Sequence, residues 1–152
     1  MRIPPPAIAA LLALPLACCA HAQEPPRCAS SIHELRQLAG DPAFPLRWEE
    51  TSMDDGKPMR VSISEHNGAL KLAFVKTDES LWAEGAGRIC RSGATLEARL
   101  SKDQLRLGPA ANWLARMALA DGAAFTLQRR TREQLHIATQ GWCGRFVPAA
   151  DD

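Results

Sequence analysis

Apolar and polar residues alternate through residues 59–77, on both sides of the pair Asn67-Gly68. This alternation is typical of β-strands, whose side chains point in turn to the two faces of a sheet, and Asn-Gly favours a tight type I′ turn. With these two residues as the turn, strand pairing places on one face Val61, Ile63, Leu72 and Phe74. The pattern therefore predicts a β-hairpin with one buried face.

A second two-residue turn is predicted at Ser92-Gly93, which would place Ile89 opposite Leu96 on the same inner face. Gly85 and Gly87 fall on that face of the preceding strand and leave it without side chains. Glycines at such positions usually mark tight curvature or the close approach of another element. A strongly bent strand is therefore expected here.

A third turn is predicted at Lys102-Asp103, with Leu100 opposite Leu105 on the inner face. On the outer face this pairing brings Arg99 directly opposite Arg106. Like charges in this position repel, so the two arginines either bind an anionic partner or extend apart into water. Arg99 and Arg106 are therefore candidate partner contacts.

Residues 46–52 predict the strand that precedes the first hairpin. If the loop between this strand and the hairpin has an even number of residues, Trp48 lies opposite Ile63 and Glu50 lies opposite Val61. Trp48 and Glu50 then both face inward. A buried, unpaired carboxylate costs several kcal/mol, so Glu50 needs a partner, a shifted pKa or water. It lies either at an open end of the sheet or in a cavity, and with Trp48 it is a candidate ligand or partner contact.

Two helices are expected. Ser31 and Glu34 form a capping box, apolar residues follow at helical spacing, and Gly40 ends a short amphipathic helix over residues 32–39. A second helix is expected to start at Gly108-Pro109, with the proline in its first turn, and to end at Asp121-Gly122. It carries on one face Trp113, Leu114 and Met117. These large apolar side chains are expected to plug what remains of the sheet's interior.

A last hairpin is predicted with a loop at residues 130–132, which places Leu127 opposite Leu135. Residues 141–147 are expected to extend the second strand of this hairpin. The fold is therefore expected to be α+β and mostly β. It is an antiparallel meander of about seven to eight strands forming a curved sheet or small barrel, with an N-terminal helix and one helix inserted before the last hairpin. The architecture resembles that of lipocalin-type barrels, with no sequence motif that names a family.

The chain begins with a segment typical of exported proteins. An uncharged apolar run, Ala7–Ala17, is too short to span a bilayer and leads to Ala20-His21-Ala22. This pattern predicts a secretory signal peptide, residues 1–22, cleaved after Ala22. Lipid attachment at Cys19 is the less favoured alternative. The protein is therefore expected to be periplasmic or secreted, with no transmembrane segment in the mature chain.

The remaining residues, 23–152, form one predicted domain with a core over about 28–148. The whole chain has 18 basic and 17 acidic residues. Removing a signal peptide that holds one arginine and no acid leaves 17 of each. Domains that bind nucleic acid usually carry a marked basic excess, so nucleic acid is not expected as a partner.

The mature chain has three cysteines, Cys28, Cys90 and Cys143. In an oxidising compartment two of them are expected to pair. Cys90 falls on the outer face, which the N-terminal helix could cover, and Cys28 lies just ahead of that helix. These positions favour a Cys28–Cys90 disulfide, with Cys90–Cys143 as the rival pair.

Catalytic chemistry is not indicated. The three histidines of the predicted mature chain, His33, His66 and His136, are expected on the surface, and the Gly-x-Ser-x-Gly motif is absent. Cys143 has a single nearby cation, Arg145, to activate it. The adjacent acids Asp54-Asp55, before Gly56, are typical of a turn rather than of a metal site. No catalytic, metal-binding or cofactor-binding residue is predicted, and the protein is not expected to be an enzyme.

Two binding functions remain. The first is a non-enzymatic module that binds an envelope protein, which is favoured because the predicted inner face is bulky enough to fill a small barrel. The alternative is a lipocalin-like carrier of a small apolar ligand, which requires a cavity inside the barrel.

Overall fold

The computed structural model describes residues 27–51 and 57–150. The predicted signal peptide and the predicted turn at Asp54-Asp55-Gly56 lie outside the described residues. In chain order the elements are β1 (Cys28–Ala29), α2 (Ile32–Ala39), β2 (Arg47–Glu50), β3 (Met59–His66), β4 (Ala69–Lys76), β5 (Leu81–Ser92), β6 (Thr95–Leu107), α3 (Trp113–Ala118), β7 (Gly122–Thr131), β8 (Gln134–Thr139) and β9 (Trp142–Pro148).

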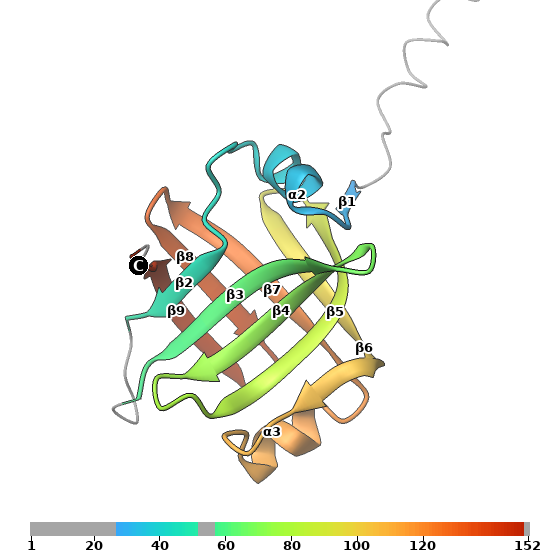
Figure 1. Ribbon diagram of the computed structural model, residues 1–152, viewed down its shortest axis with the longest axis vertical. Coiled ribbons are helices and arrows are strands. Elements are labelled where there is room, and N and C mark those ends of the chain that lie inside the picture. Colours follow the sequence, from blue (N-terminus) through green and yellow to red (C-terminus); the bar gives the residue numbers. More distant parts are fainter. Residues whose placement is uncertain (1–26, 52–56, 151–152) are drawn as a thin grey trace, which may run out of the picture.

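Strands β2 to β9 form a closed antiparallel barrel of eight strands (Figure 1). Each strand pairs with the next one along the chain, and β9 pairs with β2 to close the ring. Closure leaves the barrel with no unpaired edge strand. The predicted mostly β fold with two helices is therefore confirmed, and of the two shapes expected it is the barrel that forms.

The hairpin of β3 and β4 forms as the sequence predicts. Asn67 and Gly68 have φ angles of 51° and 76°, as both central residues of a type I′ turn require. Ile63 pairs with Leu72, and Val61 pairs with Phe74. The predicted inner face is also confirmed, because twelve of its members are buried: Trp48, Val61, Ile63, Leu72, Phe74, Ile89, Leu96, Leu100, Phe125, Leu127, Leu135 and Ile137.

The turn between β5 and β6 lies one residue later than predicted. Its two residues are Gly93 and Ala94, so Ile89 pairs with Ala98 rather than with Leu96. Gly93 has a φ of 61°, and a tight hairpin turn that needs positive φ at its first central residue selects glycine there. The shift moves the pairing by two residues and leaves the inner face unchanged.

The predicted turn at Lys102-Asp103 is wrong, because β6 runs through these residues as one bent strand. Leu105 pairs with Gly85 of β5 instead of with Leu100. A Cβ on Gly85 would lie 2.5 Å from the Gln104 carbonyl oxygen, so the bend brings the backbone too close for any side chain. The expectation of a close approach at this glycine is confirmed.

The last strands also differ from the prediction. Leu127 pairs with Ile137 rather than with Leu135. Residues 141–147 do not extend β8, because the chain turns at Gln140-Gly141 and returns as β9. Gly141 has a φ of 80°, which explains why glycine occupies this turn.

Helix α2 covers one end of the barrel (Figure 1). Ser31 caps it by accepting a hydrogen bond from the Glu34 amide at 3.1 Å, and Gly40 ends it in the left-handed conformation. Leu35 and Leu38 are buried in the core. The helix therefore lies across the barrel's end, whereas the sequence analysis placed it on the outer face of the sheet.

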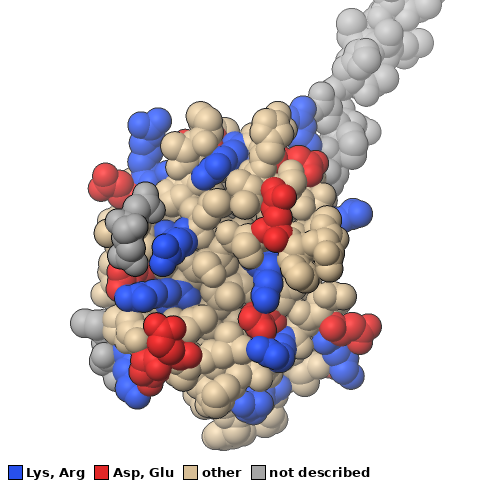
Figure 2. All heavy atoms as spheres, viewed as in Figure 1, with Lys and Arg blue, Asp and Glu red and all other residues tan. Residues whose placement is uncertain are grey.

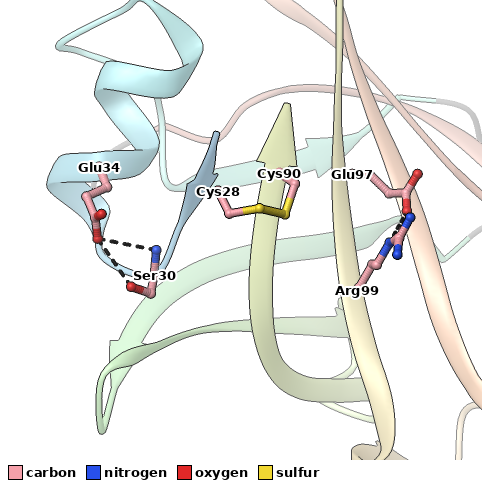
Figure 3. Close-up of a disulfide and its surroundings, with 6 residues drawn as sticks. All are labelled: Cys28, Ser30, Glu34, Cys90, Glu97 and Arg99. Atoms are coloured by element: carbon pink, nitrogen blue, oxygen red, sulfur yellow. Dashed lines mark hydrogen bonds and ion pairs between the residues drawn. A yellow bond between two sulfur atoms is a disulfide. The ribbon is translucent and has the colours of Figure 1, made fainter. Parts of the chain in front are cut away.

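The predicted Cys28–Cys90 disulfide is present (Figure 3). It joins directly paired residues of β1 and β5, so the short strand β1, and not α2, covers Cys90. Cys143 is free and exposed. No helix among residues 27–51 and 57–150 is long and apolar enough to cross a membrane.

The segment between α2 and β2 packs with α2 to close this end of the barrel, which we call the sealed α2 end. Arg129 of β7 reaches inward and donates a hydrogen bond to the Asp41 carboxylate at 2.6 Å. Its guanidinium lies 5.2 Å from the ring centre of Phe44 and 5.9 Å from that of Trp48. Trp48 also donates from Nε1 to the Pro45 carbonyl oxygen at 2.8 Å. These contacts hold the aromatic rings and the cation in one packed cluster.

Candidate binding surface at the α3 end of the barrel

Helix α3 lies at the end of the barrel opposite α2 (Figure 1). Asn112 caps it by accepting a hydrogen bond from the Ala115 amide at 2.9 Å. Arg116 donates to the carbonyl oxygens of Gly108 at 2.7 Å and Ala111 at 3.2 Å, which ties the helix to the segment that leads into it. A Cβ on Gly108 would lie 2.2 Å from the Leu81 carbonyl oxygen, so this segment packs tightly on β5.

The large apolar side chains of α3 point away from the barrel. Trp113, Leu114 and Met117 are 66%, 59% and 68% exposed. The side of the helix that packs on the core is made of Ala115 and Ala118, followed by the buried Leu119. The expectation that Trp113 and Met117 plug the barrel is therefore wrong.

The interior has no room for these side chains because other aromatic rings already fill it. Phe74 of β4 stacks on Phe125 of β7, with ring centres 4.7 Å apart, so two walls of the barrel meet across its interior. Trp82 lies 5.8 Å from Phe74 and 5.4 Å from Trp142. This aromatic packing occupies the level of the barrel nearest α3.

The sequence analysis did not assign Trp82 and Trp142 to the inner face. Trp82 lies beside a β-bulge, where the pairing of β4 with β5 shifts between Phe74 and Val75. The bulge lets Trp82 and its neighbour Ala83 both be buried, which strict alternation forbids. Trp142 could have been found from its spacing of four residues from Phe146, once the turn at Gln140-Gly141 was recognised.

A small apolar cavity opens between α3 and the turn that joins β8 to β9. Its volume is about 270 Å³, and its lining includes Trp82, Leu114, Leu119, Trp142 and the turn residues Gln140-Gly141. The exposed side chains of Trp113 and Met117 belong to the same short helix as Leu114. We call the three exposed residues together with this cavity the α3 surface.

Glu50 faces the interior from β2. The side chain is partly buried, and its Oε1 accepts a hydrogen bond from the Met59 amide at 3.1 Å, so the carboxylate has the partner expected for it. Its Oε2 would lie 2.8 Å from a Cβ on Gly144, so the glycine makes room for the carboxylate. The predicted pairing in this region is off by two residues, because Trp48 pairs with Val61 and not with Ile63.

The other predicted contacts lie apart. Trp48 is fully buried in the sealed α2 end. Arg99 and Arg106 are not opposite each other, because the turn that would have paired them does not form. Arg99 forms an ion pair with Glu97 (Figure 3), and Arg106 forms one with Glu84 at 2.7 Å. The structure therefore does not bring the four predicted contacts into one site.

Metal-ligating and nucleophilic residues are also scattered. Among residues 27–51 and 57–150, no group of three or more His, Cys, Asp or Glu side chains is placed to hold a metal ion. His136 has a pKa lowered by burial and by the nearby positive charges of Arg130 and Arg145.

Comparison of the chain with protein-family models, curated proteins and solved structures finds no match.

Proposed function

We propose that the protein is a non-enzymatic binding module that holds another protein through the α3 surface. The observation that carries this proposal is the exposure of Trp113, Leu114 and Met117 on one side of a six-residue helix. Residues three and four positions apart share a helix face, so the three side chains form one patch. Such patches on folded proteins commonly mark interaction sites, and tryptophan is enriched among the residues that dominate binding energy.

The cavity beside the patch suits a side chain of the partner. Its volume of about 270 Å³ lies at the lower limit of cavities that bind small molecules, which start at about 300 Å³. An apolar side chain inserted there would contact Trp82 and Trp142 while its neighbours pack on Trp113. Interfaces often use such an anchor in a desolvated pocket.

The packing of the interior supports a protein partner over a small apolar ligand. A lipocalin-like carrier holds its ligand inside the barrel, and here Phe74 and Phe125 stack across that space. A carrier would therefore have to hold its ligand outside this space, for example in the cavity at the α3 end.

An extracytoplasmic location fits this function. The Cys28–Cys90 disulfide is typical of proteins that fold in an oxidising compartment. The predicted signal peptide, residues 1–22, points the same way. The partner would then be another protein of the cell envelope.

Site-specific photo-crosslinking in the native host tests the proposal. A photoreactive residue at Leu114 should capture one protein, and the same residue at Val75, on the outer face of β4, should not. The captured protein, once purified, should bind the full mature chain in calorimetry. Binding of the captured protein should be lost in the double variant Trp113→Ser/Met117→Gln. It should be retained in the matched double variant Val75→Gln/Val147→Gln.

Two results would contradict the proposal. Equal capture at both positions would show that the α3 surface has no special role. Native mass spectrometry that finds a small apolar molecule bound, and lost with Trp113→Ser/Met117→Gln, would favour the carrier instead.

A further inference from the structure

The outer wall formed by β7, β8 and β9 carries charge of one sign. These three strands contain no Asp or Glu. His136 pairs directly with Arg145 on one side and with Gln128 on the other, so their side chains share the outer face. Arg130 lies at the β-bulge that follows Arg129; its side chain is exposed, and its charge acts on His136. We call Arg130, His136 and Arg145 the basic wall.

The opposite wall of the barrel is built differently. There Arg60 pairs with Glu49 at 3.9 Å, while Lys71 and Arg106 both pair with Glu84, at 3.5 and 2.7 Å. Figure 2 shows this side of the molecule, with acidic and basic side chains interspersed. Each of these cations therefore already forms an ion pair with a carboxylate of the same chain, with Glu84 shared by two of them.

The basic wall has no such compensation. Within the described part of the chain, neither Arg130 nor Arg145 forms an ion pair. Burial lowers the pKa of His136, and the positive charges of Arg130 and Arg145 lower it further. An anionic group placed between the two arginines would be stabilised by both of their positive charges.

We propose that the basic wall binds an acidic segment of a polypeptide. Arginine presents a planar fork of donors that matches the two oxygens of a carboxylate, and two arginines flank the histidine. A membrane surface fits less well, since membrane-binding proteins place basic residues around their apolar anchors. Here Arg130 lies near the end of β7 farthest from α3, where the exposed apolar residues are. The inference rests on residues separate from the α3 surface and can fail independently of it.

His136 makes the binding depend on pH. The charged groups that face it are Arg130 of β7 and Arg145 of β9, and both disfavour the imidazolium. A carboxylate bound between them would favour the imidazolium and so raise the pKa of His136. Binding then takes up a proton, so the acidic segment binds more tightly as the pH falls.

The probe for the test is a synthetic hexa-aspartate peptide, titrated into the full mature chain at pH 7.5 and 5.5. Its side chains stay ionised over this range, because aspartate titrates near pH 3.9. Arg130→Gln/Arg145→Gln should weaken binding about five-fold or more. The matched control Arg60→Gln/Lys71→Gln removes the same charge from the opposite wall and should change the affinity by less than about two-fold. His136→Gln should remove the tightening at pH 5.5.

Each contrary result is decisive. Equal weakening by the two double variants would show that net charge, rather than the basic wall, sets the affinity. Absence of peptide binding, or binding only to phosphatidylglycerol vesicles, would overturn the acidic polypeptide as the ligand. Tightening at low pH that persists in His136→Gln would overturn the role of the histidine.

Discussion

The two ends of the barrel are each covered by a short helix, but the helices differ in what they bury. Helix α2 places Leu35 and Leu38 in the core and is anchored by the adjacent Cys28–Cys90 disulfide. Helix α3 has no fully buried residue of its own and leaves its largest side chains in solvent. One end is therefore closed by buried side chains, and the other leaves large apolar side chains exposed.

The difference comes from the space that the barrel leaves at each end. At the α3 end, Trp82 and Trp142 fill the interior, so alanines are the residues that fit beneath the helix. At the α2 end the leucines and Phe44 supply the packing. Whether the large apolar side chains of a short helix are buried or exposed thus depends on what the strands already place inside the barrel.

Removing the disulfide should give the largest effect on stability. The bridge spans a sequence separation of 62 residues, for which the chain-entropy model gives about 4 kcal/mol. Urea denaturation of Cys28→Ser/Cys90→Ser should show this loss, while Cys143→Ser should stay within about 0.5 kcal/mol of the parent. A loss below about 1 kcal/mol would mean that packing alone holds the α2 end.

A matched pair of leucine substitutions compares the two ends directly. Leu35→Ala removes a fully buried side chain and should cost about 2–5 kcal/mol. Leu114→Ala removes one that is 59% exposed and should cost no more than about 0.5 kcal/mol. Equal losses in urea denaturation would show that α3 is packed against a further surface in solution.

Alternation along the chain was enough to predict which face of a strand is buried wherever no bulge interrupts the strand. The side of the sheet to which a side chain points depends on whether its position in the strand is odd or even. A shift of the strand pairing by two residues therefore leaves that side unchanged. This is why Ile89 is correctly placed on the inner face although its partner is Ala98 and not Leu96. The exact pairing depends on turn length and on bulges, which the alternation does not encode.

The candidate site was harder to predict. Helix α3 is apolar on both sides, with alanines on one and Trp113, Leu114 and Met117 on the other, so periodicity alone does not orient it. The contacts of Arg116 with carbonyl oxygens before the helix help to set the orientation, and such contacts have no sequence pattern. The assumption that the larger side chains point inward was wrong because a bulge had already placed Trp82 there.

The smallest predicted effect concerns the seal of the α2 end. The hydrogen bond from Arg129, aided by one from the Ala43 amide, holds the pKa of Asp41 below its ordinary value near 3.8. A carboxyl whose pKa is lower in the folded state stabilises that state above its unfolded pKa, and this contribution is lost as the pH falls through the two values. Asp41→Asn should therefore lower Tm at pH 7, and the difference from the parent should shrink below about pH 4. The matched control, Asp103→Asn on the bent part of β6, should show no such convergence with the parent. A Tm difference for Asp41→Asn that stays constant from pH 7 to 3 would mean that Arg129 holds this end through Phe44 and Trp48, without help from the carboxylate.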